Sequence, residues 1–341
     1  MLNYEEFKEY VKDHIKDYLP LTYKDAEVRI EKIRKNNNQF WEGLQVIIPG
    51  QNVIPNIYLE QTFQAYKEGT AMEDILKGCA SVITVNKASK FFDAKDMIYN
   101  WSFVKEHLMV QVVNAQRNQE RLKEIPHVMK EDLALTYRIV LEDGEDGRAS
   151  TQVDNRMLGH WGVTKEELHE TAMENSKVIA PAILKCMGDM MMGILGAENM
   201  EGVDQNDFMK DTMFIISNEQ LVDGASAIFY GDCLERLAEK MESDLYILPS
   251  SIHETIVIST EGAEVDELAS IVQAVNSSEV NPEEQLSDHV YRYDAASREI
   301  KLADTTMERI REEMAVAENP GVYQAAKKEQ GLDSSKKGKG R

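Results

Sequence analysis

Residues 244–259, DLYILPSSIHETIVIS, constrain the possible fold more than any other segment of this chain. Two runs rich in β-branched and aromatic residues, LYIL and TIVIS, flank a polar turn that begins at Pro249. Such runs favour strands, and a proline within a polar stretch favours a turn. The segment therefore predicts an antiparallel hairpin, in which two strands adjacent in the sequence pair with each other.

The turn of this hairpin carries the side chains best suited to chemistry, Ser250, Ser251, His253 and Glu254. A serine–histidine–acid site needs such groups to converge in space, whereas neighbouring residues of a strand point to opposite faces. One interpretation is a polar site at the mouth of the hairpin. In the other, Pro249 sets the turn and the serines bond the local backbone. These four residues are therefore a candidate polar site, and none of them is assigned a catalytic role.

Helical and strand-like patterns are mixed along the rest of the chain, with no repeat at a fixed period. Helices are expected at residues 4–18, 60–67, 72–92, 114–125, 164–180, 182–194, 232–241, 263–275 and 305–317, and a helix-start pattern lies at 281–284. Further strands are expected at residues 26–33, 40–48, 107–114, 132–141, 151–154, 212–217, 289–294 and 298–302. Hairpins outnumber β-α-β units, so the predicted fold class is α+β, with mixed helices and antiparallel hairpins in two subdomains.

The chain divides by composition into three parts. A helix-rich α+β region is expected over 1–105, and a second α+β domain of unknown function over 106–318. Residues 319–341 end in KKEQGLDSSKKGKGR, which is rich in glycine, serine and lysine and has no apolar period. This composition predicts a disordered basic tail.

The chain is strongly acidic. Lys and Arg number 38 and Asp and Glu number 60, so the formal net charge is −22. Six basic and two acidic groups in the last 15 residues leave −26 on residues 1–326. Phosphates would be repelled, so direct nucleic-acid binding by the body of the protein is not expected. The acidity fits a solvated surface, a surface for a basic protein partner, or a mimic of nucleic-acid charge.

Residues that bind metals or cofactors show no recognisable spacing. The three cysteines, Cys79, Cys186 and Cys233, are far apart and sit in apolar neighbourhoods, so they are expected to be core residues in a reducing compartment. The sequence contains neither G-x-x-x-x-G-K-[ST] nor G-x-G-x-x-G, and its histidines lack ligand spacing. We expect no cofactor, no metal, no secretion signal and no membrane span, and hence a cytoplasmic location.

Four motifs together resemble a known group of proteins. They are DNRMLGHWGVTKEELHETAMEN, NEQLVDGASAIFYGDCLERLAEKM, DLYILPSSIHETIVI and VYRYDAASREIKLA. The set is similar to an uncharacterised protein family of gut Clostridia and related Firmicutes and, more distantly, to the second half of YtpQ-like proteins. The resemblance is best over 107–303. It implies a domain of unknown function, encoded by accessory genes of which some lie on mobile elements, with no established catalytic residues to carry over.

These observations favour a non-enzymatic cytoplasmic accessory or interaction protein, with an acidic surface for a basic partner. Salt would weaken the long-range attraction of such a pair. One alternative is an anti-defence inhibitor that mimics nucleic-acid charge and blocks a nucleic-acid-binding enzyme. The other is a hydrolase-like enzyme that uses the 249–254 turn. The partner, the substrate and the oligomeric state do not follow from the sequence.

Overall fold

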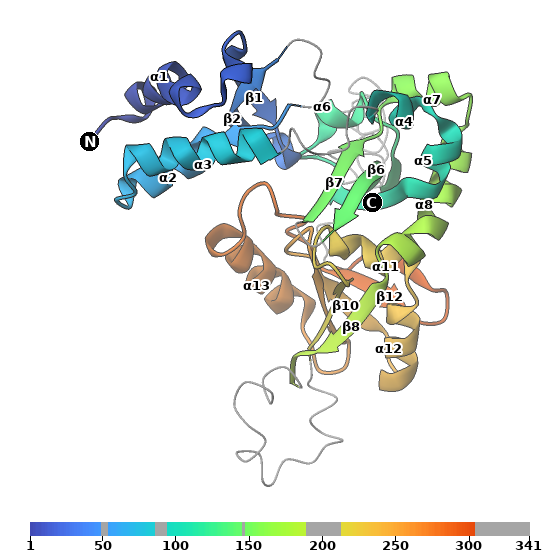
Figure 1. Ribbon diagram of the computed structural model, residues 1–341. Helices are drawn as coiled ribbons and strands as arrows, with labels where there is room; N and C mark the ends of the chain where they lie inside the picture. Colours follow the sequence, from blue (N-terminus) through green and yellow to red (C-terminus); the bar gives the residue numbers. More distant parts are fainter. Residues whose placement is uncertain (49–53, 86–93, 145–146, 189–212, 304–341) are drawn as a thin grey trace, which may run out of the picture.

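Three antiparallel sheets and the helices around them make up the computed structural model of this protein (Figure 1). The structure describes residues 1–48, 54–85, 94–144, 147–188 and 213–303. Each sheet is paired from strands that run antiparallel, and helices are interspersed in the chain order rather than alternating regularly with strands. The α+β fold class is confirmed.

The N-terminal region contains a small sheet with the strand order β1-β2-β3. Its elements are α1 (Tyr4–His14), η1 (Ile15–Tyr18), η2 (Leu21–Tyr23), β1 (Glu27–Arg34), η3 (Asn36–Asn38), β2 (Phe40–Ile47), β3 (Ile57–Tyr58), α2 (Leu59–Lys67) and α3 (Met72–Val85). Asn3 begins α1, because its side chain accepts from the amide of Glu6 while Glu6 reaches back to the amide of Asn3. The apolar faces of these helices enclose one core with the sheet, which includes Phe7, Leu44 and Leu76.

The central sheet is built around one long strand. Its strands are β4 (Leu108–Asn114), β5 (Val128–Lys130), β6 (Leu133–Gly144) and β7 (Gly147–Gln152), and β6 pairs with the other three. The helices of this part are α4 (Ala94–Tyr99), α5 (Trp101–His107), α6 (Gln119–Leu122), α7 (Asn155–Trp161) and α8 (Lys165–Ile179). Every residue of β4 is buried, as its largely apolar sequence predicts, and the buried residues include the polar Gln111 and Asn114. The side chain of Thr164 caps α8 by accepting from the amide of Glu167.

The third sheet has six strands in the order β13-β12-β10-β11-β9-β8. The strands are β8 (Ala182–Cys186), β9 (Phe214–Asn218), β10 (Leu245–Leu248), β11 (Thr255–Ser259), β12 (Tyr291–Asp294) and β13 (Glu299–Leu302), and the helices are η7 (Gly224–Ser226), α11 (Ala227–Tyr230), α12 (Cys233–Met241) and α13 (Val265–Ser278). Leu245 pairs with Ser259 and Leu248 with Ile256, which confirms the predicted hairpin. The hairpin at 289–302 is confirmed in the same way.

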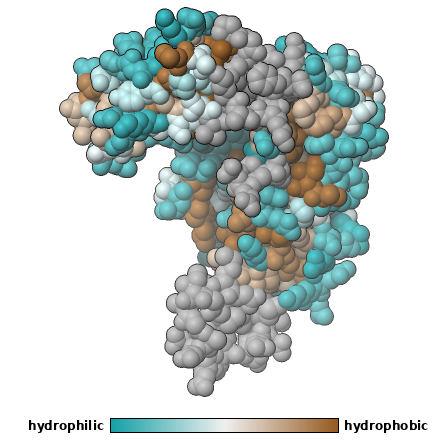
Figure 2. Space-filling model, in the orientation of Figure 1, coloured by the Kyte–Doolittle hydropathy of each residue, from teal (hydrophilic) through white to brown (hydrophobic). Residues whose placement is uncertain are grey.

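Side chains of the 244–259 hairpin alternate between two apolar layers. Ile247 and Val257 face the largest core, which also contains residues of β4, β6, α8 and α12. Tyr246, Ile256 and Ile258 lie on the other face, where α13 covers them. Much of the visible surface is hydrophilic, and hydrophobic residues form a band over this sheet between α13 and β8 as well as smaller patches elsewhere (Figure 2).

Three expectations about local structure differ from what is observed. Residues 182–186 form a strand and not a helix, because Pro181 lacks an amide hydrogen and separates α8 from a segment that pairs with β9. The expected polar helix at 114–125 is short, with α6 covering four residues. Asn281–Glu284 is a turn and starts no helix. The expected helix at 305–317, the tail at 319–341 and the segment 189–194 lie outside the described residues.

All three cysteines were expected to be core residues. Cys79 and Cys233 are buried and Cys186 is half-buried. Within the described ranges, every helix is too short or too polar to cross a bilayer. The sharp turn between β1 and β2, by contrast, has a buried side chain that its polar sequence does not predict.

Asn37, in this β1–β2 turn, connects all three sheets. Its backbone has a positive φ of 55°, and its side chain is 5% exposed. Asn37 Nδ2 donates to the carbonyl oxygens of Pro282 (2.8 Å) and Gln285 (2.6 Å), which precede β12. The amide of Asn37 donates to Asn118 Oδ1 (3.1 Å), and Asn118 Nδ2 donates to Asn37 Oδ1 (3.0 Å). Asn118 directly precedes α6, so one asparagine holds the N-terminal, central and third sheets at a common point.

Further polar contacts extend this junction. Asn114, at the end of β4, donates from Nδ2 to the carbonyl of Leu286 at 2.9 Å. The buried carboxylate of Asp132 accepts from Ser287 Oγ at 2.8 Å and from the hydroxyl of Tyr291. Burying a polar group costs free energy unless the group is hydrogen-bonded. These hydrogen bonds therefore fix how the loop at 281–288 lies against the central sheet.

We expect Asn37→Ala to lower the free energy of unfolding by about 3 kcal/mol, because it removes several hydrogen bonds and leaves buried partners unpaired. Asn38→Ala is the matched control. Asn38 also has a positive φ (54°) but is exposed, so this change should cost about 1 kcal/mol, the penalty of left-handed backbone alone. Urea unfolding of the full chain measures both values. Equal losses in the two variants would show that the Asn37 side chain contributes nothing to the junction.

Candidate functional site

The predicted polar turn at 249–254 is part of the hydrogen-bonded framework of the third sheet. The loop that precedes β12 runs alongside it, with the amide of Ile252 donating to the carbonyl of Glu284 (2.8 Å) and the amide of Leu286 donating to the carbonyl of Ser250 (3.2 Å). The amide of Ser287 donates to the carbonyl of Pro249 at 3.0 Å. The backbone of the turn is thus paired with a segment more than 30 residues away in the sequence.

The hydroxyl of Ser251 forms a hydrogen bond with the local backbone. Ser251 Oγ accepts from the amide of His253 at 3.0 Å, which is the usual way in which a serine closes a turn. Ser250 is half-buried, and Glu254 is exposed while the next residue, Thr255, is buried. The structure therefore brings Ser251 to the main chain of His253 and not to its ring.

The ring of His253 contacts two groups far away in the sequence. Its Nδ1 accepts from the amide of Asp223 at 3.2 Å, so in the neutral ring the proton lies on Nε2. Nε2 lies 3.6 Å from Glu284 Oε1. The acidic partner of His253 is therefore Glu284 rather than the adjacent Glu254. With Nδ1 occupied by a backbone amide and Nε2–H facing a carboxylate, the neutral ring offers no free lone pair to a substrate.

Gly224 lies tightly against this turn. A Cβ atom at Gly224 would lie 2.2 Å from Ser217 Oγ, 2.5 Å from the carbonyl oxygen of His253 and 2.7 Å from the amide nitrogen of Asn218. Ser217 Oγ also donates to the same carbonyl of His253 at 2.7 Å. Only glycine lets η7 approach β9 and the turn this closely.

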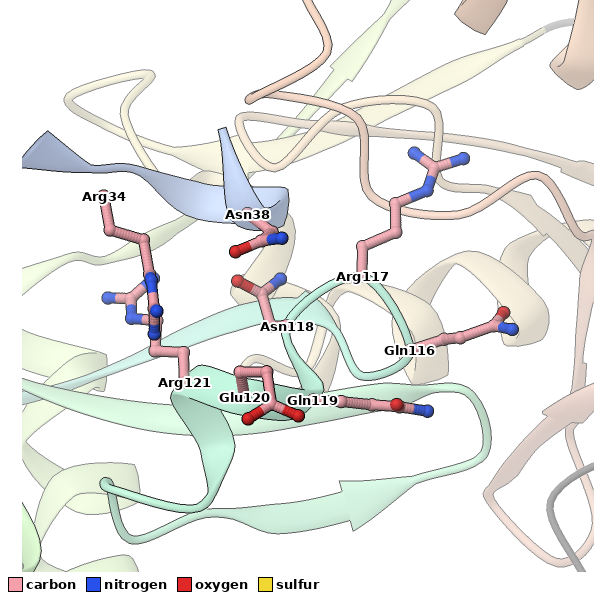
Figure 3. A pocket seen from close by; sticks show the side chains of 8 residues that line it. All are labelled: Arg34, Asn38, Gln116, Arg117, Asn118, Gln119, Glu120 and Arg121. Carbon is pink, nitrogen blue, oxygen red and sulfur yellow. The ribbon is translucent and has the colours of Figure 1, made fainter. Parts of the chain in front are cut away.

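A second polar site, which the sequence did not indicate, lies where β1 approaches α6 (Figure 3). It is a pocket of about 170 Å³, called here the arginine pocket, lined by Arg34, Asn38, Gln116, Arg117, Asn118, Gln119, Glu120 and Arg121. The side chains of Arg34 and Arg121 extend toward each other from β1 and α6, while Arg117 points away from them (Figure 3). The sequence contains one related signal, since Arg138 interrupts the otherwise apolar strand LALTYRIVL.

A third feature is a groove beside α12, called here the acidic groove. It has a volume of about 480 Å³ and is lined by Glu235, Ala238, Glu239, Glu242, Ser243, Asp244, Tyr293, Ala295, Ala296 and Arg298. Four of these residues are acidic and one is basic. Among the residues that the structure describes, no three His, Cys, Asp or Glu side chains are placed to hold a metal ion.

We expect Gly224→Ala to lower the free energy of unfolding by about 3 kcal/mol, because two of the three nearest atoms belong to backbone that cannot move aside. Gly159→Ala is the matched control. Gly159 lies inside α7 with no atom within 4 Å of an added Cβ, so alanine should stabilise by about 0.5–1 kcal/mol. Thermal and urea unfolding distinguish the two. If Gly224→Ala left the free energy of unfolding unchanged, the close packing of η7 against the turn would be contradicted.

Comparison with known proteins places the chain in a family without a described role. No curated protein and no solved structure matches the chain. Residues 4–295 match a family described as a family of unknown function (DUF5688), and this range includes the 249–254 turn, the arginine pocket and nearly all of the acidic groove. The resemblance to an uncharacterised family is confirmed at this level. Since the match covers well over half of the sequence, the chain belongs to DUF5688, a family of unknown function.

Proposed function

We propose that this protein acts by binding a basic protein partner, and that the acidic groove beside α12 is where the partner binds. The observation that carries the proposal is the pair Glu239 and Glu242 on its rim. Both are exposed, and within the described ranges neither forms an ion pair. A cationic side chain of a partner would provide the missing counter-charge.

The other carboxylates of the acidic groove already have partners. Glu235 pairs with Arg298, and Asp244 pairs with Arg292 and accepts from the amide of Ala295 at 2.9 Å. These contacts lower the pKa of Asp244, chiefly through the amide of Ala295 and then through Arg292. The paired residues hold the shape of the groove, and the unpaired ones leave it with surplus negative charge.

The floor of the acidic groove suits a long cationic side chain. Tyr293 is 5% exposed, and burial is the main cause that raises the pKa of its hydroxyl, with further contributions from Glu235 and Glu239. A lysine or arginine that entered would lay its apolar stem against Tyr293 and Ala238 and place its charge among the carboxylates. The formal charge of −22 would speed the encounter with a basic partner.

The geometry of the polar turn supports binding over hydrolysis. The hydroxyl of Ser251 and both ring nitrogens of His253 face groups of the protein itself, so the residues that a hydrolase would use here contact the framework instead. A nucleic-acid-binding enzyme is one kind of basic partner, and the proposal therefore includes a cytoplasmic anti-defence inhibitor that mimics nucleic-acid charge. The division into 1–105 and 106–318 remains part of this proposal. The separate core formed within residues 2–83 supports two units, whereas α4 and α5 pack on the core of the second unit.

We expect the tagged full chain to retain a basic protein from host lysate at low salt and to lose it at high salt, because ions screen exposed charges. The double variant Glu239→Lys and Glu242→Lys should weaken that interaction by about tenfold or more, since it replaces attraction by repulsion. Affinity capture followed by mass spectrometry identifies the partner, and titration with the purified partner measures the change.

The matched control is Glu170→Lys with Glu174→Lys. These two residues are exposed on α8, and their reversal changes the net charge by the same amount away from the groove. Equal weakening in both double variants would mean that overall charge, and not the acidic groove, attracts the partner. Retention of the partner at high salt would contradict the electrostatic proposal as a whole.

A further inference from the structure

We propose that the arginine pocket binds a small phosphate-bearing anion, either inorganic phosphate or a phosphomonoester. This site differs from the acidic groove in position, in charge and in the ligand that it would accept. The inference does not depend on the proposed protein partner.

The first argument is a guanidinium group that lacks a counter-charge. Arg121 is half-buried and donates from one terminal nitrogen to Gln152 Oε1 at 2.5 Å. Behind it, Arg138 donates to Ser150 Oγ at 2.8 Å and to the carbonyl oxygen of Ser150 at 3.1 Å. All these acceptors are neutral, and neither arginine forms an ion pair in the part of the chain that the structure describes. A buried charge without a partner costs several kcal/mol, so such a group usually has a use.

The second argument is that these guanidinium groups repel one another. Burial is the largest cause that lowers the pKa of Arg121, to about 10, and Arg138 and Arg34 lower it further. Burial also lowers the pKa of Arg138. The carboxylate of Asp223 opposes both shifts, but it accepts a hydrogen bond from Gln111 Nε2 at 2.9 Å and forms no ion pair with either arginine. The carboxylate of Asp223 therefore opposes two guanidinium groups, those of Arg121 and Arg138, and Arg34 adds a third positive charge that acts on Arg121.

The third argument is the arrangement of the groups that line the arginine pocket. Arg34 is exposed at the end of β1, and its guanidinium lies 5.7 Å from the centre of the Phe40 ring, so its charge remains accessible to a ligand. Arg117 is already paired with Asp288 and Gln285. Glu120 is the single carboxylate among the lining residues, and it is exposed and paired with Lys123 at 2.5 Å. Glu120 therefore offsets part of the charge of Arg34.

Phosphate matches this arrangement better than other anions. Arg34 and Arg121 approach from two sides, and each presents several N–H groups in a plane. A carboxylate has two oxygens to share between them, whereas a phosphate has enough oxygens for a bidentate pair with each arginine. The volume of about 170 Å³ lies below the roughly 300–1,000 Å³ of sites for drug-sized molecules, so the pocket suits one phosphoryl group. The formal charge of −22 disfavours a nucleic-acid strand as the source of that group.

Calorimetric titration of the full chain with inorganic phosphate tests the site, with acetate as the carboxylate control and glycerol 3-phosphate as the ester. We expect phosphate or its ester to bind with a dissociation constant below about 1 mM and acetate to bind at least tenfold more weakly. Tighter binding of the ester would mean that its organic part contacts the rim, and tighter binding of the free ion would identify inorganic phosphate as the ligand. Absence of binding by both phosphates up to about 10 mM would overturn the proposal.

Arg34→Gln should weaken phosphate binding by about tenfold or more, because it removes a charged donor from an exposed position at the pocket. Arg29→Gln is the matched control, since Arg29 is exposed on the same strand, pairs with Glu27 and does not line the pocket. Equal affinities for Arg34→Gln and the unmodified protein would overturn the assignment of the site, as would equal weakening in both variants.

A second variant separates ligand binding from folding. Arg121→Met removes the half-buried charge and keeps much of the apolar stem, so phosphate-free protein should unfold at the same temperature as the unmodified chain or higher. Phosphate should raise the melting temperature of the unmodified chain and not that of Arg121→Met. An equal rise in both would indicate a general salt effect and overturn the proposal.

Discussion

The buried amide of Asn37 is the contact on which the arrangement of this protein depends. It lies at the end of β1 in a left-handed conformation, and from there it bonds both Asn118 and the carbonyls of the loop that precedes β12. Because unpaired amides are costly in the interior, the three sheets can meet only where all these partners are satisfied. The 249–254 turn, which pairs with the same loop, and the arginine pocket, which includes Asn38 and Asn118, are both positioned by this junction.

The distribution of charge distinguishes the two proposed sites. Most of the surplus negative charge is solvated, and at the acidic groove the exposed Glu239 and Glu242 add to it. Near the junction the balance changes, because Arg34 and Arg138 both act on Arg121, and Asp223 opposes the charges of Arg121 and Arg138 without an ion pair to either. Solubility alone does not require half-buried guanidinium groups that lack counter-ions. This contrast in charge is the basis of the two proposals, a basic protein partner at the acidic groove and a small phosphate-bearing anion at the arginine pocket.

Elements with strong local patterns were predictable. The 244–259 hairpin, the buried strand β4 and the capped start of α8 all follow from residues adjacent in the sequence. Residues 182–186 were wrongly expected to be helical, because a short apolar run has no period that separates a buried strand from a helix. Their pairing with β9, across residues 187–213, decided the outcome. The candidate polar turn was located from its residue types, but the contacts of those residues were not predictable.

The sequence by itself determined the acidic character, the α+β class, the main hairpins and the presence of reactive side chains at 250–254. Only the tertiary structure decided what those side chains do. His253 meets Glu284, 31 positions away, and Arg34 meets Arg121 across 87 positions. Local patterns report backbone preference and burial, which act over a few residues. Hydrogen bonds and charges act between whichever groups the packed sheets bring together, so the identity of a site is decided by the fold.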